Sequence, residues 1–173
     1  DYDVLVVLSP HWRTYVGHHF LGVESFKSKS VDPIFPNLFR FNYDLKVDVD
    51  LAEGIHNEAE KLGMPVKMMR NPNFRVDYGT IVSCHLTNPK WNKPIVSISS
   101  TSSTAYYSMD YTQREMLKLA EATKKAVEAS GTRAVLLASN SLSHRHFTVE
   151  SEVPEDMSQE HITSHNQYLW DMK

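Results

Sequence analysis

The sequence predicts an α/β fold in which helices flank a central sheet that is mostly parallel or mixed. Residues 4–8 and 134–138 are short apolar runs, which are typical of strands buried on both faces of a parallel sheet. Segments with apolar residues at helical spacing alternate with such runs, without internal repeats or low complexity. This alternation is the pattern of α/β domains.

Composition places limits on the function. The 173 residues suffice for one domain with a core, and 41% apolar and 23% charged residues are typical of a soluble globular protein. A formal charge of −3 without a basic cluster argues against nucleic acid as a partner. No apolar run approaches the roughly 20 residues of a membrane span, and no leader pattern indicates secretion. The single Cys84 excludes an internal disulfide and fits a reducing, cytoplasmic setting.

The two ends indicate part of a longer chain. The first residue is Asp1, and a predicted core strand begins almost at once. Residues 168–173 still carry large apolar side chains, as if a helix stopped before its cap. We therefore expect some of the chemistry to lie outside this sequence.

The first predicted strand brings a histidine to the edge of the sheet. Pro10 has no N–H group for a sheet ladder, so the strand is expected to end there. His11 then lies just past the carboxyl end of a central strand, where α/β sheets bind ligands. A histidine that caps the strand through a nearby carbonyl is an equally good interpretation of this stretch alone.

The next segments are a strand and a loop. Residues 13–24 predict a strand or hairpin arm, in which His18 and His19 point to opposite faces, so at most one of them serves a given site. A surface or carbonyl-bonded pair is the more ordinary interpretation. Residues 25–43 combine phenylalanines with prolines and are expected to form a long ordered loop.

A helix and a strand follow. Asp48 or Asp50 is expected to cap a helix with an apolar stripe that ends near residue 62. His56 lies beside that stripe and is interpreted as a surface residue. Residues 66–69 predict a short strand.

Residues 77–80, Asp-Tyr-Gly-Thr, form a motif after a predicted loop. The glycine allows a tight turn, so Tyr78 is placed at a corner between a strand and a helix. A tyrosine there is usually a packed aromatic with a hydrogen-bonded hydroxyl, and a catalytic donor is the less common case. Cys84 and His85 lie in the apolar segment 81–86 and are interpreted as structural.

The last third of the chain begins with a strand predicted over residues 94–99. Asp110 is expected to cap a long helix that ends at Gly131. After the second apolar run, a linker is expected at residues 154–157 and a final helix from residue 158.

Two buried strands thus end in polar segments with a histidine, namely His11 after the first and His144 after residues 134–138. If both strands are central, both imidazoles reach the same edge of the sheet. Imidazole binds zinc, copper and ferrous iron, and its pKa near roughly 6.5 also suits proton transfer. The motifs of zincins, structural zinc sites, nucleophile elbows and P-loops are absent from the sequence. The residues alone therefore indicate a metal site or an acid–base site.

Three motifs resemble, in their order along the chain, those of the class III extradiol ring-cleaving dioxygenases. They are Leu-Ser-Pro-His-Trp (8–12), Val-Asp-Tyr-Gly-Thr (76–80) and Ser-Asn-Ser-Leu-Ser-His (139–144). Further segments resemble the catalytic subunits of the aminophenol-cleaving branch, at residues 20–23, 31–39 and 67–72. The resemblance covers essentially the whole chain and implies that residues 1–173 are a partial catalytic domain without the family's amino- and carboxyl-terminal parts.

The resemblance implies a non-haem Fe(II) site with two histidines and one glutamate as ligands. His11 matches the second of those histidines. The other histidine and the glutamate have no counterpart in this chain. Iron rather than manganese is also implied by the family alone, since both metals accept this ligand set.

The resemblance also implies roles for three further residues. His144 matches a histidine that takes a proton from the substrate hydroxyl and returns one later. Tyr78 stands where many members have histidine, and it is expected to donate a hydrogen bond to substrate or bound oxygen. A structural or pocket-wall role is favoured for His146.

The activity implied by the resemblance is extradiol cleavage of 2-aminophenol with dioxygen, giving an aminomuconic semialdehyde. A paired alpha subunit in a hetero-oligomer is implied as the partner. One alternative is a catechol- or protocatechuate-type dioxygenase on the same scaffold. The other is a non-catalytic paired subunit, against which the presence of both His11 and His144 argues.

Overall fold

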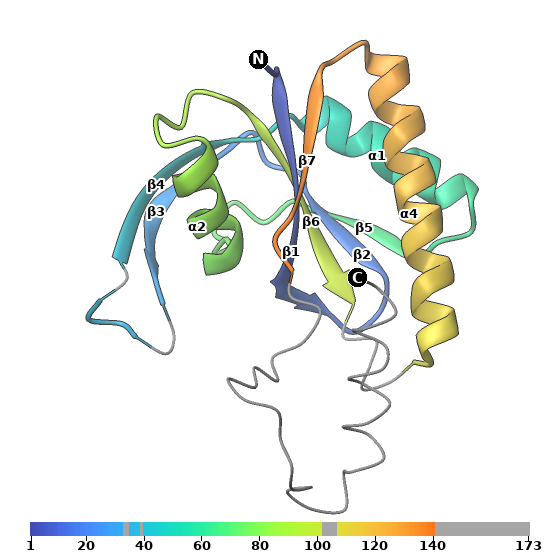
Figure 1. The fold of residues 1–173 in the computed structure, drawn as a ribbon, viewed down its shortest axis with the longest axis horizontal. Helices are drawn as coiled ribbons and strands as arrows, with labels where there is room; N and C mark the ends of the chain where they lie inside the picture. Colours follow the sequence, from blue (N-terminus) through green and yellow to red (C-terminus); the bar gives the residue numbers. More distant parts are fainter. Residues whose placement is uncertain (33–34, 39, 102–106, 141–173) are drawn as a thin grey trace, which may run out of the picture. The chain divides into compact units, whose positions relative to one another are not determined.

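The computed structural model describes residues 1–32, 35–38, 40–101 and 107–140, all within one compact unit, 1–140 (Figure 1). The helices in these ranges are α1 (Val49–Lys61), α2 (Tyr78–Thr87) and α4 (Met109–Ser130). The strands are β1 (Val4–Thr14), β2 (His18–Leu21), β3 (Ser25–Val31), β4 (Arg40–Lys46), β5 (Val66–Met69), β6 (Ile95–Thr101) and β7 (Ala134–Ala138). None of these helices is long and apolar enough to cross a membrane.

The central sheet has the strand order β5-β2-β6-β1-β7. Strand β1 runs parallel to both β6 and β7, and β2 runs parallel to β5. The β2–β6 pair is antiparallel, with Phe20 opposite Ile98. The sheet is therefore mixed, and the predicted α/β class is confirmed.

Strand β1 is buried on both faces, as its apolar run predicts. Val4 and Val6 belong to an apolar cluster with residues of α1 and α4. Leu5 and Val7 belong to a second cluster, with residues of α2, β3 and β4. Figure 1 shows α1 and α4 on one side of the sheet, and α2 with the β3–β4 hairpin on the other. The alternating direction of side chains along a strand produces this division.

The prediction that the first strand ends at Pro10 is wrong, because β1 continues to Thr14. Its register with β6 breaks at this place: Ser9 pairs with Ser99, and Arg13 pairs with the next residue of β6. Residues 10–12 have no partner in that ladder. Proline still explains the break, since it cannot donate a ladder hydrogen bond, but the chain resumes pairing after a bulge.

The prediction of a long loop over residues 25–43 is also wrong. Strands β3 and β4 form an antiparallel hairpin in which Phe26 faces Leu45 and Ser28 faces Tyr43. In β4 the large side chains Tyr43 and Leu45 are buried, and they alternate with exposed polar ones. This period of two is the signal of a strand, and it was obscured by the serines and lysines of β3.

The N-cap prediction is confirmed for α1 and wrong for α4. Asp48, one of the two expected residues, caps α1 by accepting a hydrogen bond from the N–H of Leu51 at 3.0 Å. For α4 the expected Asp110 is wrong, because Ser108 is the cap and accepts from the N–H of Tyr111 at 3.2 Å. Asp110 lies in the first turn instead, where its negative charge interacts favourably with the positive end of the helix dipole.

Strand β7 differs from the second fully buried strand that its composition predicts. Within the described sheet it is the last strand beside β1, and Val135 and Leu136 are 43% and 63% exposed. An apolar run shows that a strand forms, but it does not show whether both of its faces are covered. The linker at 154–157 and the helix from residue 158 fall outside the described residues.

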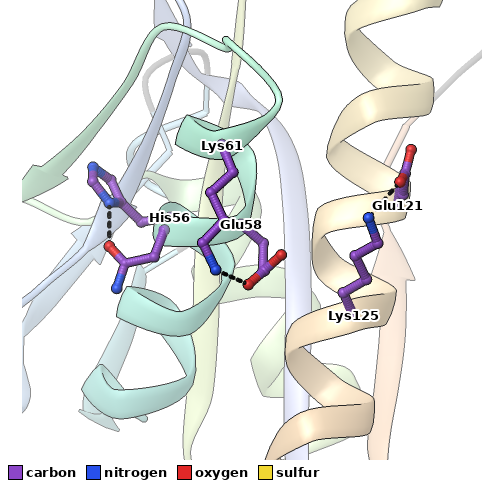
Figure 2. A network of polar contacts seen from close by, with 6 residues as sticks. His56, Glu58, Lys61, Glu121 and Lys125 are labelled. Atoms are coloured by element: carbon purple, nitrogen blue, oxygen red, sulfur yellow. Dashed lines mark hydrogen bonds and ion pairs between the residues drawn. The ribbon is translucent and has the colours of Figure 1, made fainter.

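Helices α1 and α4 pack against each other through apolar side chains rather than through charges. The buried residues of this contact include Ile55, Ala59, Leu119 and Ala122. Figure 2 shows the polar groups nearby: Glu58 pairs with Lys61, and Glu121 pairs with Lys125, each at 2.6 Å and each within its own helix. Such exposed pairs add little stability, so apolar burial holds the two helices together.

Candidate functional site

His11 lies in the register break of β1. Its ring is exposed, whereas the neighbouring Ser9 and Trp12 are buried. The backbone N–H of His11 donates to Ser9 Oγ at 3.2 Å. The break thus turns the imidazole out of the sheet while the residues around it remain anchored.

Tyr78 is the first residue of α2, and it meets His11. Its hydroxyl lies 3.1 Å from His11 Nε2, and the two ring centroids are 4.3 Å apart at an interplanar angle of 47°. Burial, with the nearby charges of Asp32 and Asp77, raises the pKa of Tyr78 above its ordinary value. The phenol therefore keeps its proton at neutral pH and serves as a hydrogen-bond donor.

The Asp-Tyr-Gly-Thr motif fixes the start of α2 against the sheet. Asp77 Oδ2 accepts from the N–H of Thr80 at 3.0 Å, the usual N-cap bond, and from Ser9 Oγ at 2.5 Å. Thr80 Oγ1 lies 3.2 Å from Ser97 Oγ on β6. Hydrogen bonds of the serine hydroxyls of two strands, Ser9 on β1 and Ser97 on β6, therefore attach the start of this helix to the sheet.

Gly79 is required by a close approach. A Cβ atom at this position would lie 2.6 Å from His11 Cδ2 and 2.6 Å from Ser9 Oγ, which is shorter than real contacts allow. The glycine thus leaves the space that the His11 ring occupies.

A pocket of about 410 Å³ opens beside the two rings. This volume lies within the usual range for small-molecule sites. Strands β3 and β4 form one wall, and the segment before α2 forms another. Two exposed cations, Lys29 and Arg75, lie on these walls. The full lining is His11, Lys29, Ser30, Val31, Tyr43, Arg75, Val76, Asp77 and Tyr78.

The structure brings together two of the three site residues expected from the sequence, His11 and Tyr78. His144 and His146 lie outside the described residues, so their roles stay predictions. Leu8 pairs with Ala138, and Ser139 donates to the carbonyl of Leu8 at 3.1 Å. The chain therefore leaves β7 beside β1, at the end of β1 that leads to His11.

The His18–His19 pair behaves as the more ordinary interpretation expects for its first member. His18 is buried, and its Nδ1 lies 2.7 Å from the carbonyl of Ser99. Its Nε2 is buried without a hydrogen-bond partner among the described residues. Burial lowers the pKa of His18, and the Ser99 carbonyl and the Glu115 charge only partly oppose that shift. A neutral, structural histidine results.

Three further residues have structural surroundings. Cys84 is fully buried, and burial raises the pKa of its thiol to about 12, so the thiolate is not available at neutral pH. His85 packs beside Phe41, with ring centroids 4.5 Å apart. His56 is half-buried and bonds the side chain of Asn57 at 3.1 Å.

Sequence reasoning placed the residues that support the pair in motifs but did not predict their contacts with it. Ser9, Asp77 and Gly79 act through contacts between segments far apart in the chain, which no local pattern announces. An aspartate directly before an apolar helical segment was a readable cap signal for α2. Lys29 was missed because its strand was interpreted as a loop.

The described residues supply one imidazole of the expected Fe(II) site. They contain no group of three histidine, cysteine, aspartate or glutamate side chains placed to hold a metal ion. The Asp77 carboxylate, which lines the same pocket as His11, already accepts hydrogen bonds from Thr80 and Ser9. These residues alone therefore do not complete a three-ligand iron site.

Comparison with known proteins connects this geometry to a family. Residues 1–173 match the family model of the catalytic LigB subunit of aromatic ring-opening dioxygenase. The chain is 54% identical over 171 residues to a 2-aminophenol 1,6-dioxygenase beta subunit from Pseudomonas sp, covering 99% of this chain and 56% of that protein. It is 27% identical over 157 residues to 3,4-dihydroxyphenylacetate 2,3-dioxygenase from Escherichia coli, covering 90% of this chain and 54% of that protein.

The chain thus spans about half the length of the curated relatives it matches. The match covers the whole sequence, including the His11 and Tyr78 motifs, and the predicted resemblance is confirmed. This chain belongs to the family of catalytic LigB subunits of aromatic ring-opening dioxygenases.

Proposed function

We propose that the full-length protein is the catalytic subunit of an extradiol dioxygenase that cleaves 2-aminophenol to an aminomuconic semialdehyde. The observation that carries the proposal is the His11–Tyr78 pair in the wall of a pocket of about 410 Å³. The 54% identity to a 2-aminophenol 1,6-dioxygenase beta subunit supports the choice of substrate.

Fe(II) is the proposed metal, with His11 as one of three ligands and a histidine and a glutamate supplied from outside this chain. The bound ion would coordinate the ring heteroatoms and dioxygen. The ligand set rests on the family resemblance, since the described residues provide only the one imidazole.

The roles of the chain's own residues follow from their placement. Tyr78 keeps its proton and donates a hydrogen bond into the pocket, toward a ring heteroatom or an oxygen. The pocket walls from β3 and β4 orient the ring beside His11. His144 is proposed as the acid–base residue that takes the proton of the substrate hydroxyl.

We also propose a paired alpha subunit and a cytoplasmic location. The Pseudomonas relative is named a beta subunit, which supports a second kind of subunit in the assembly. The buried free thiol of Cys84 is compatible with a reducing compartment.

A second candidate substrate is a catechol with an anionic substituent. Lys29 and Arg75 both line the pocket, and neither forms an ion pair with another described residue. An unpaired cation at a pocket wall favours a carboxylate over a neutral ring edge. The name of the Escherichia coli relative, 3,4-dihydroxyphenylacetate 2,3-dioxygenase, is consistent with this alternative.

Oxygen uptake by the full-length protein tests the proposal. The protein is purified with any subunit that accompanies it, loaded anaerobically with Fe(II), and given 2-aminophenol, catechol or 3,4-dihydroxyphenylacetate in turn. We expect the highest kcat/KM with 2-aminophenol. A preference for 3,4-dihydroxyphenylacetate that disappears in Lys29→Gln and Arg75→Gln would favour the second candidate. Bound iron without oxygen uptake on any of the three would contradict both and favour a non-catalytic subunit.

A further inference from the structure

The contact between α2 and the register break of β1 is polar and buried. Ser9 has no exposed surface, and its hydroxyl donates to Asp77 Oδ2 at 2.5 Å. The same hydroxyl oxygen accepts the backbone N–H of His11 at 3.2 Å. Ser9 therefore joins the N-cap of α2 to the backbone of the residue that carries the imidazole.

The break needs such a connection. Residues 10–12 lack partners in the ladder with β6, and the pairing of β1 with β7 extends only to Leu8. Ordinary sheet hydrogen bonds therefore do not fix the backbone at His11. An unfixed backbone segment costs conformational entropy whenever it must adopt one geometry. The bonds of Ser9 remove part of that freedom in advance.

Asp77 makes more bonds than a helix cap requires. A cap needs one acceptor for the N–H of Thr80, and serine, threonine or asparagine would supply it equally well. The carboxylate also takes the short bond from Ser9, and a bond to an ionised acceptor is stronger than a neutral one. Gly79 admits this arrangement, because a Cβ there would meet both Ser9 Oγ and the His11 ring.

We propose that Ser9 and Asp77 are positioning residues, which hold His11 opposite Tyr78 through the two hydrogen bonds of the Ser9 hydroxyl. The catalytic consequence rests on the proposed function, in which His11 is a metal ligand. The geometric part concerns the His11–Tyr78 pair alone. Both parts are accessible to experiment on the full-length protein.

Ser9→Ala removes the connecting hydroxyl and leaves the cap of α2 in place. Thr80→Val is the matched control: it deletes a buried hydroxyl on the same turn of α2, whose hydrogen-bond partner among the described residues is Ser97 on β6. Asp77→Asn is the conservative variant, because it keeps an acceptor for both bonds. The other carboxylate oxygen, Oδ1, has no partner among the described residues, so its replacement by an amide nitrogen breaks no bond there.

The first measurement is the NMR signal of the His11 imidazole in metal-free protein labelled with ¹³C-histidine. We expect the signal to shift in Ser9→Ala, to shift less in Asp77→Asn, whose neutral oxygen accepts the Ser9 bond more weakly, and to stay near its wild-type position in Thr80→Val. An unchanged signal in Ser9→Ala, or an equal shift in Thr80→Val, would overturn the positioning role. This result does not depend on whether the protein is a dioxygenase.

The second measurement is the dissociation constant for Fe(II), determined by anaerobic equilibrium dialysis. Changes to residues that orient a metal ligand typically cost about 10–100-fold in affinity, so Ser9→Ala should weaken binding by about 10-fold or more. Thr80→Val should bind Fe(II) as the wild type does, whatever stability it loses. A loss in Asp77→Asn as large as in Ser9→Ala would assign the effect to the charge of Asp77 and contradict positioning. If the wild type itself binds no Fe(II), the proposed function fails, and the NMR result alone decides the inference.

Discussion

The two faces of the central sheet are covered in different ways. On one face, α1 and α4 contact the sheet through apolar side chains, and the ion pairs Glu58–Lys61 and Glu121–Lys125 each lie within one helix (Figure 2). On the other face, α2 also packs apolar side chains against the sheet, but its first turn meets β1 and β6 through buried hydroxyls, a carboxylate and a glycine. Apolar contact is strong and non-directional, whereas hydrogen bonds fix distances and angles. The apolar contacts should therefore determine stability, and the polar contacts around the first turn of α2 should determine the placement of the site.

The largest effect is expected from the apolar face. Ile55→Ala removes a fully buried side chain between α1 and the sheet, and such changes cost about 2–5 kcal/mol of unfolding free energy. Urea denaturation should show a lower midpoint with an unchanged slope. The folded fraction should keep its affinity for Fe(II). A specific loss of affinity without loss of stability would break the division between the two faces.

A smaller effect, on activity rather than on stability, is expected from the polar face. Tyr78→Phe deletes the hydroxyl that lies 3.1 Å from His11 Nε2 and lines the pocket. One hydrogen bond contributes about 0.5–1.5 kcal/mol, which corresponds to a loss in kcat/KM of up to about 10-fold. Stability should change by no more than about 0.5 kcal/mol, because the ring remains. Equal activity of the variant and the wild type would remove Tyr78 from the site.

A pH effect on stability is expected from His18, which is buried in β2 within the central sheet. Burial holds its pKa below the unfolded value of roughly 6.5, so the unfolded chain binds the proton more tightly. The stability contributed by neutral His18 is therefore complete above that pH and decreases as the pH falls below it. Denaturation curves between pH 7.5 and pH 5 check this decrease. In His18→Gln the unfolding free energy should fall less steeply as the pH decreases. A pH dependence equal to that of the wild type would assign the decrease to other groups.

The smallest effect is expected at the ion pairs of Figure 2. Lys61→Ala deletes the partner of Glu58 on the surface of α1. Exposed pairs of this kind contribute about 0.5 kcal/mol or less, and the contribution is screened by salt. Denaturation should show a small difference between variant and wild type without added salt, and a smaller one in 0.5 M salt. A loss above about 1 kcal/mol would mean that charges, and not apolar contacts alone, hold α1 in place.

Local patterns predicted the repetitive parts of the fold. The apolar run of β1, the stripe of α1 and the left-handed Gly131 after α4 are each readable within a few residues. Exposure of β7 was not predictable, because burial depends on what lies opposite a strand. The β3–β4 hairpin was missed because polar residues on its outer face weaken the pattern.

The site was predictable in part and for a definite reason. His11 and Tyr78 stand in motifs whose order along the chain resembles that of a known family, and the structure places their side chains in contact. Their contact joins residues 67 positions apart, and the bonds from Ser9 to Asp77 cross a similar separation. Such contacts follow from the packing of α2 on the sheet, which no single stretch of sequence specifies.

The register break of β1 has a consequence for how the family can diversify. Pairing with β6 stops at Ser9 and resumes at Arg13 against the adjacent residue, so the sheet is continuous across the break. Pro10, His11 and Trp12 are a three-residue insert carried on an intact strand. Substitutions at His11 can therefore change the chemistry at this edge without changing the alignment of the strands. Within the insert, Trp12 is buried in the core whereas the His11 side chain is exposed, so variation is least costly at position 11.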